Sequence, residues 1–242
     1  MAKLTWDTAG NKLYETGVSN GVLYPYTSSP STVGQNYGPG VAWNGLSSVS
    51  ESPDGAEAND IYADNAKYLS LISAETFGCT IEAYTYPDEF ALCDGTASPA
   101  DCAGMYIGQQ TRTKFGLCYK TILGNDGSGD NYAYKLHLVY GCLASPSEKQ
   151  YDTVNDSPEA ISFSWEVNTT PVDITIDGMT LKPTATIVID SSKFTDAVAK
   201  ARLTALENKL YGTDASGETA ATTAYLPLPA EVYTTLKTPA AG

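Results

Sequence analysis

The stretch ISFSWEVN at residues 161–168 decides the fold class, because its apolar and polar side chains alternate without a break. A two-residue period is that of a β-strand with one face buried and the other in water. We therefore expect a mainly β protein with a large apolar core. The two faces of this strand are Ile161, Phe163, Trp165 and Val167 against Ser162, Ser164, Glu166 and Asn168.

Two segments before this stretch alternate in the same way. They lie at 112–120 and 132–140, and the linker GNDGSGDN at 124–131 between them is rich in turn residues. Such a linker predicts that the two strands form an antiparallel hairpin. The expected faces are Tyr132, Tyr134, Leu136, Leu138 and Tyr140 against Lys135, His137 and Val139, and Thr113, Phe115, Leu117 and Tyr119 against Arg112, Lys114 and Lys120.

Weaker patterns complete the set of expected strands. The acidic stretch ESPDGAEAND at 51–60 has no alternation and is expected to be a long exposed loop, of the kind that often has a functional role. The additional strands are expected at 41–50, 67–75, 79–86 and 184–190.

Composition divides the chain into three parts. Residues 1–40 are rich in Gly, Ser, Pro, Asn and Tyr and are expected to form an extended N-terminal arm, with a disordered tail as the alternative. Residues 41–212 form the expected β-rich core, which includes one helix at about 193–211. Residues 213–242 contain prolines and are expected to form an extended C-terminal arm. The helix is predicted by Ala199, Leu203, Leu206 and Leu210 at helical spacing, with Asp190, Ser191 and Ser192 as capping candidates and Gly212 after the end.

The charge is strongly acidic and unevenly placed. The formal net charge is -14 with a single His, which argues against a protein that grips nucleic acid by neutralising phosphates. A surface past which nucleic acid slides stays compatible with this charge. Between Leu13 and Thr111 there are twelve acids against one base, Lys67. The N-terminus MAKLTWD has no apolar signal core, and no stretch approaches the roughly 20 apolar residues of a membrane span. Synthesis in a cytoplasm with reduced thiols and no membrane association are expected.

Residues that could carry chemistry are few. His137 is the single histidine and lies on a partly polar strand face, so a structural or surface role is favoured over membership of a catalytic triad. The five cysteines lack the paired spacing of a zinc site and are expected to be small buried side chains, with a disulfide between Cys93 and Cys102 as the alternative. No catalytic, cofactor-binding or metal-binding residue and no cofactor is expected, and the chain is not expected to be an enzyme.

One loop resembles the beginning of a calcium-binding loop. Asp126, Ser128 and Asp130 supply alternate oxygen ligands. However, Asn131 stands where the turn glycine belongs, and His137 stands where the bidentate Glu belongs. A calcium site is therefore not expected.

Eight strings, in order, carry a resemblance to a known family. They are VAWNGLSSVSESPDGAE at 41–57, YADNAKYLSLISAE at 62–75, TIEAYTYPDEFALCDG at 80–95, IGQQTRTKFGLCYKTILGND at 107–126, YKLHLVYGCLASPSEKQYDTVND at 134–156, TPVDI at 170–174, PTATIVIDSSKF at 183–194 and LENKLYGTD at 206–214. Together they cover most of the chain. They resemble the major tail (tail tube) proteins of long-tailed bacteriophages and prophages.

The resemblance implies a specific architecture and role. It implies two packed antiparallel sheets that form a sandwich or barrel with a flanking C-terminal helix, and no additional immunoglobulin-like domain. Copies of the chain would close into rings, expected to be hexameric, which stack into the hollow tube of a non-contractile (siphovirus) tail. Phage DNA would pass through the lumen to the host without specific binding. The implied partners are other copies of the chain and the tape measure, tail terminator and distal tail proteins, in a virion tail assembled in the host cytoplasm.

Two placements of charge and two other functions are left open. Part of the acidic stretch from Glu51 to Asp101 is expected to face the lumen or a ring interface, and the alternative is a solvated exterior. Arg112, Lys114 and Lys120 are expected to form a basic strand face that pairs with acids of an adjacent subunit. The other functions are a different virion component, such as a tail completion or head decoration protein, and a carbohydrate-binding β-sandwich.

Overall fold

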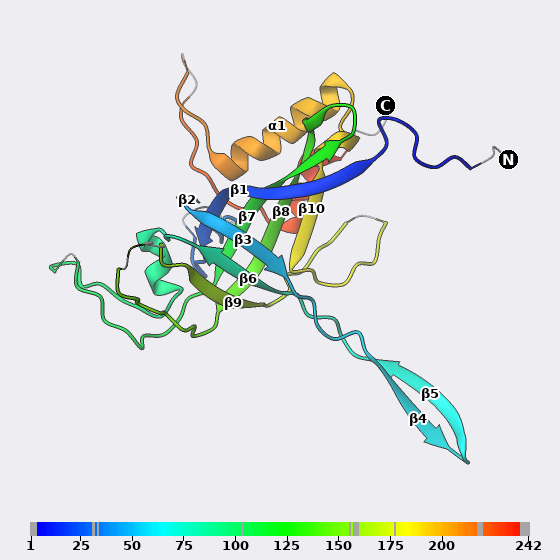
Figure 1. The fold of residues 1–242 in the computed structure, drawn as a ribbon, viewed down its shortest axis with the longest axis horizontal. Coiled ribbons are helices and arrows are strands. Elements are labelled where there is room, and N and C mark those ends of the chain that lie inside the picture. Colours follow the sequence, from blue (N-terminus) through cyan, green and yellow to red (C-terminus); the bar gives the residue numbers. More distant parts are fainter. Residues whose placement is uncertain are drawn as a thin grey trace.

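The structure is a computed structural model, and it describes residues 4–30, 32, 34–102, 104–154, 156, 160–176, 178–216 and 220–237. It is mainly β, with two helices near the C-terminus (Figure 1). The strands are β1 (Leu13–Pro25), β2 (Val41–Trp43), β3 (Leu46–Glu51), β4 (Ala58–Ala63), β5 (Ala66–Ile72), β6 (Gly78–Ala83), β7 (Phe115–Asn125), β8 (Gly129–Ala144), β9 (Phe163–Thr169) and β10 (Thr186–Asp190). The helices are α1 (Ala197–Tyr211) and α2 (Pro229–Leu236), with short 3-10 turns η1 (Asp88–Leu92) and η2 (Ser191–Lys193).

Eight strands form one antiparallel sheet, in the order β2-β1-β7-β8-β9-β6-β3, with β10 also paired to β8. The sheet curls, so that Leu46 of β3 packs against Gly21 of β1. The remaining strands, β4 and β5, form a separate two-stranded antiparallel sheet. The expected fold class is confirmed: mainly β, with antiparallel sheets, a sandwich-like core and a flanking C-terminal helix. The predicted hairpin is formed by β7 and β8, which turn between Asn125 and Gly129.

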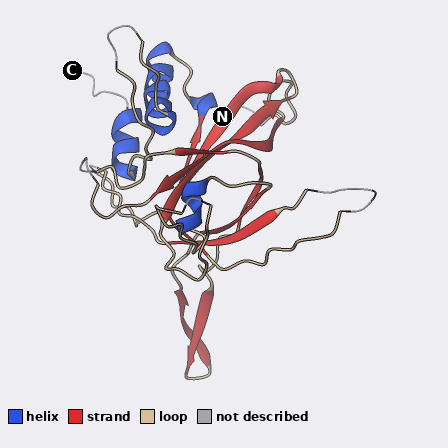
Figure 2. Cartoon of the chain, turned by 90° about the vertical axis from the view of Figure 1, so that its left-hand side faces the viewer, coloured by secondary structure: helices blue, strands red, loops and turns tan. Residues whose placement is uncertain are grey.

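The sheet separates two apolar clusters. Inside the curl, the ring of Phe90 packs against those of Trp165 and Phe115, whose centroids lie 5.0 and 5.5 Å from its own. On the other face, α1 and α2 cover the sheet (Figure 2), and Leu206 and Leu210 of α1 are fully buried. Strand β8 contributes to both clusters: Leu136, Leu138 and Tyr140 face the helices, whereas Val139 faces the inside of the curl. The strand is irregular at Gly141, which has a φ of 61°, and Cys142 after it also faces the inside.

The expected N-terminal arm is wrong for residues 13–25. These residues form β1, which lies between β2 and β7 and buries Leu23 and Tyr24 completely. The Gly and Asn residues that suggested a coil lie where the strand is irregular: Gly17 and Asn20 have positive φ angles of 69° and 51°, and the pairing with β7 shifts register around Ser19. Glycine and asparagine tolerate this left-handed conformation, so they mark bulges here and not the end of a strand.

The two helices also refine the expected boundaries. The α1 helix begins at Ala197 and not at about 193, because the 3-10 turn η2 occupies residues 191–193. Asp196 is the N-cap of α1, and its side chain accepts a hydrogen bond from the Ala199 N–H at 2.8 Å. The expected C-terminal arm contains α2, which begins with Pro229. Proline is well suited to the first turn of a helix, because its missing N–H would have no helical partner there.

We expect Leu206→Ala to lower the free energy of unfolding by about 2–5 kcal/mol, because it leaves a cavity between α1 and the sheet. Urea denaturation would measure the change. The matched control is Val198→Ala on the exposed side of the same helix, where 63% of the residue is accessible. The control should change stability by less than about 0.5 kcal/mol, and equal losses in the two variants would contradict the assigned packing.

Candidate functional site: the projecting hairpin

Between β3 and β6 the chain leaves the body of the protein and returns as a long hairpin, residues 52–77, which we call the projecting hairpin (Figure 1). Its stalk, residues 52–57 and 73–77, is held by paired backbone hydrogen bonds between Asp54 and Thr76, at 2.9 and 2.8 Å. Gly55 in the stalk has a φ of 88°, and a Cβ there would collide with the carbonyl oxygen of Ala74. The expected exposed loop at 51–60 is therefore in part a strand, since β4 begins at Ala58.

The end of the projecting hairpin is an amphipathic ribbon. Ile61 lies opposite Leu69, and Leu71 follows two residues later on the same face of β5. These three side chains are 39%, 37% and 55% exposed. On the other face, Asp60 accepts hydrogen bonds from Lys67 at 2.7 Å and from Ser70 at 2.6 Å. We call Ile61, Leu69 and Leu71 the apolar stripe.

A two-stranded ribbon cannot bury its own apolar stripe. Isolated hairpins are at best marginally stable in water, and they need a third strand or another surface to pack on. Large exposed apolar side chains gathered in one place mark an interaction surface. Tyr62, Tyr68 and Ile72 add to the exposed area, with 68%, 72% and 71% accessible. The projecting hairpin therefore has the properties of a docking element.

The acidic stretch is divided among three environments. The projecting hairpin carries five acids against the single base Lys67, and this part of the stretch is exposed. Asp94 is instead buried, where it accepts hydrogen bonds from Trp165 at 3.0 Å and from Lys149 at 2.6 Å. Glu51, the last residue of β3, lies at the base of the projecting hairpin.

Glu51 connects the start of the projecting hairpin to side chains at the centre of the sheet. Its carboxylate accepts a hydrogen bond from the Tyr119 hydroxyl at 2.6 Å and lies 3.2 Å from His137 Nδ1. His137 Nε2 lies 3.0 Å from the Thr121 hydroxyl, so each ring nitrogen has one polar partner. The rings of Tyr119 and His137 are stacked, with centroids 4.6 Å apart. His137 is thus a buried strand histidine with two polar partners.

The charge of Glu51 is stabilised by this arrangement. The hydrogen bond from His137 is the largest influence and lowers the pKa of Glu51. Burial opposes it, and the hydrogen bond from the Tyr119 hydroxyl lowers the pKa further. Burial and the hydrogen bond to Glu51 raise the pKa of Tyr119 far above its ordinary value. An ionised Glu51 and a protonated Tyr119 are therefore the stable pair at neutral pH.

The expected basic strand face is wrong, because its three residues lie in different environments. Arg112 precedes β7 and donates to the Ala144 carbonyl at 3.2 Å and to Asp94 at 3.5 Å. Lys114 donates to the Thr170 hydroxyl at 3.2 Å. Of the three, Lys120 alone lies within β7, with its ammonium 3.9 Å from the centre of the Tyr134 ring.

The acids of the calcium-like loop bind the N-terminal segment. Asp126 accepts hydrogen bonds from the backbone N–H groups of Gly10 at 3.0 Å and Lys12 at 3.2 Å, and Asp130 accepts one from the Tyr14 hydroxyl at 2.7 Å. These bonds fasten the start of β1 to the β7–β8 turn. Within the described ranges, no group of three or more His, Cys, Asp or Glu side chains is arranged to hold a metal ion.

The five cysteines are free thiols, and four of them are buried. The alternative disulfide between Cys93 and Cys102 is not formed, since Cys93 lies in the core and Cys102 on the surface. Burial raises the pKa of Cys79 and of Cys118 to about 12, so both remain protonated. In the part of the chain that the structure describes, no helix has the length and apolar character needed to cross a membrane.

Comparisons with known proteins found a weak likeness among solved structures. No protein-family model and no curated protein matches the sequence. Among solved structures, a chain of the cryo-EM structure of the anti-feeding prophage (AFP) baseplate, symmetrised sixfold, aligns over 77% of this chain and 97% of its own length. The identity is 10% and the TM-score 0.33, and at that level of similarity no conclusion about fold or function is drawn from it.

The Glu51 network predicts a pH dependence. Because the folded-state pKa of Glu51 is lowered, its contribution to stability is present above the ordinary glutamate pKa of 4.5 and is lost as the pH falls through the folded-state value. We expect Glu51→Gln to destabilise the protein at pH 7 and to cost much less near pH 3. Urea denaturation at both pH values would measure this, with Glu57→Gln on the exposed stalk as the control. A loss that is the same at both pH values would show that the charge of Glu51 has no role.

Proposed function

We propose that this chain is a structural subunit that polymerises with copies of itself to form the tube of a long-tailed bacteriophage tail. The observation that carries the proposal is the projecting hairpin, whose apolar stripe extends away from the body with no covering element of its own chain in the described residues. The eight strings quoted above, which resemble major tail proteins, support the choice of a tail tube among the possible polymers. The role is structural and not enzymatic.

The edges of the sheet suit such a polymer. The order of the sheet ends at β2 and at β3, and β10 pairs with β8 alone. Val188 of β10 is 48% exposed. Unpaired strand edges present backbone donors and acceptors to any neighbouring chain, and a closed ring is one way in which a β protein uses them without uncontrolled aggregation. Neighbouring copies would complete the sheet into a larger barrel around a lumen.

The negative charge suits a conduit for DNA. A basic lumen would hold phosphates through the release of counterions, whereas acidic residues repel them and leave DNA free to move. The exposed acids of the projecting hairpin would therefore lie at the lumen or between rings. The hexameric ring, the non-contractile tail and the partners at its ends, namely the tape measure, terminator and distal tail proteins, follow from the family resemblance and belong to this proposal.

We expect the purified protein to form tubes of uniform diameter above a threshold concentration, and Leu69→Ser with Leu71→Ser to raise that threshold at least tenfold. Burying a leucine is worth about 1.5–3 kcal/mol, and each 1.4 kcal/mol is a factor of ten in affinity. Electron microscopy and sedimentation across a concentration series would measure the threshold.

The control for this experiment is Val198→Ser, which removes an exposed apolar side chain from α1, away from the projecting hairpin. Circular dichroism would verify that all variants fold. A wild-type chain that remains a monomer at every concentration would refute the proposed polymer. A single ring per tail, found by labelling phage particles, would instead identify a terminator.

A further inference from the structure

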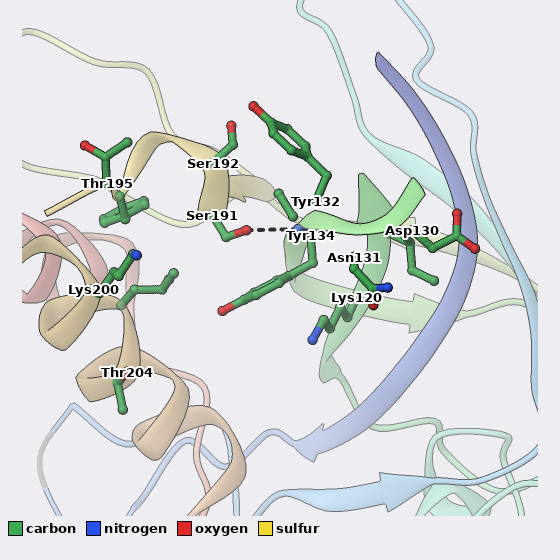
Figure 3. Close-up of a pocket in the computed structure, with 14 residues that line it drawn as sticks. Lys120, Asp130, Asn131, Tyr132, Tyr134, Ser191, Ser192, Thr195, Lys200 and Thr204 are labelled. Atoms are coloured by element: carbon green, nitrogen blue, oxygen red, sulfur yellow. Dashed lines mark hydrogen bonds between the residues drawn. The ribbon is translucent and has the colours of Figure 1, made fainter. Parts of the chain in front are cut away.

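A cleft of about 750 Å³ lies between the β7–β8 hairpin and the first half of α1 (Figure 3). Its apolar part is made by Ile122, Phe194 and Leu203, and its polar part includes Lys120 and Lys200. Figure 3 shows Lys200 reaching toward the cleft from α1, with Lys120 across from it on the strand side. The cleft therefore combines an apolar floor with two cations.

The two lysines are available for an external partner. Among the residues that the structure describes, neither lysine forms an ion pair, and Lys120 contacts the face of the Tyr134 ring. The acid that lines the cleft, Asp130, already accepts a hydrogen bond from the Tyr14 hydroxyl. In a chain of net charge -14, a cleft with two such cations is suited to an acidic occupant.

The tip of the projecting hairpin has the complementary chemistry. Asp64 and Asn65 form its turn with φ angles of 50° and 60°. Asp60 is neutralised by Lys67, so Asp64 is the remaining acid of the ribbon. Tyr62, two residues before it, is 68% exposed. The tip thus presents one carboxylate and one aromatic ring, which match the cations and the apolar floor of the cleft.

The tip and the cleft of one chain lie at opposite ends of the molecule. In Figures 1 and 2 the β4–β5 ribbon extends from one end, whereas α1 and the β7–β8 turn lie at the other. One chain therefore cannot fill its own cleft. A contact between tip and cleft is head-to-tail, and a head-to-tail contact generates rings or open-ended polymers.

We infer that the cleft between β7, β8 and α1 receives the hairpin tip of a second copy, with Asp64 pairing with Lys200 and Tyr62 packing on the floor beside Phe194. This inference rests on the proposed polymer and specifies which surfaces meet. Each copy donates one tip and accepts one, so every subunit in the polymer makes the same pair of contacts. The charges set the orientation of docking, and the aromatic ring supplies buried area.

A charge exchange tests the pairing. Asp64→Lys and Lys200→Asp should each raise the threshold concentration for polymerisation about tenfold or more, and the chain that carries both changes should return close to the wild-type threshold. Aspartate at position 200 lies in the first part of α1, where a negative charge interacts favourably with the helix dipole, so this variant is expected to fold. Asp64→Asn tolerates the positive φ angle and removes the charge alone, and it should show a smaller effect of the same sign.

The controls exchange charges elsewhere. Glu148→Lys and Lys182→Asp, both at exposed positions outside the projecting hairpin and the cleft, keep the same change in net charge and should leave the threshold unchanged. Polymerisation of both Asp64→Lys and Lys200→Asp at the wild-type threshold would overturn the inference while the proposed polymer stands. Failure of the double variant to recover would overturn the specific pairing. Failure of the wild-type chain itself to polymerise would refute the proposed function.

Discussion

The burial of β8 on both faces is the constraint on which the rest of the structure depends. A strand covered on one face can lie at the surface, but Leu138 and Val139 point in opposite directions and both are fully buried. This requires a curled sheet on one side and helices on the other, and it leaves the long β7–β8 hairpin as the rigid centre of the protein. Elements that cannot join this centre, above all β4 and β5, project from it.

The sequence predicted the parts whose signal is local. Alternation identified β9 with its buried face around Trp165 and β8 with the face of Leu138, but not the burial of the opposite face of β8 at Val139. Leu203, Leu206 and Leu210 identified α1, because periodicity depends on neighbours along the chain. It failed for β1, where Gly17 and Asn20 suggested a coil. Bulges and coils use the same residues, and pairing with β7 over a separation of about 100 residues decides between them.

The candidate site was only partly foreseen, for the same physical reason. The acidic composition of 51–60 indicated an exposed segment, but the apolar stripe depends on the cross-strand pairing of Ile61 with Leu69. The contact between Glu51 and His137 joins residues that are 86 positions apart, and no spacing rule predicts it. Arg112 was expected on a docking face, yet the buried carboxylate of Asp94 binds it within the chain. Long-range partners, which a periodic pattern does not encode, decided each case.

The stalk of the projecting hairpin would change the energetics of the proposed assembly. A flexible loop of this length would lose roughly 1–2 kcal/mol per residue on docking, whereas backbone bonds at Asp54 and Thr76 and the Glu51 network already fix the direction of the ribbon. Pre-organisation therefore allows a small contact to suffice. However, one tip in one cleft is too small to be stable by itself, because specific interfaces bury about 1,200–2,000 Å² in total. In the proposed polymer, a subunit that both donates and accepts a tip, and that also pairs its sheet edges, would gain enough contact area, and free chains would remain dispersed until growth begins.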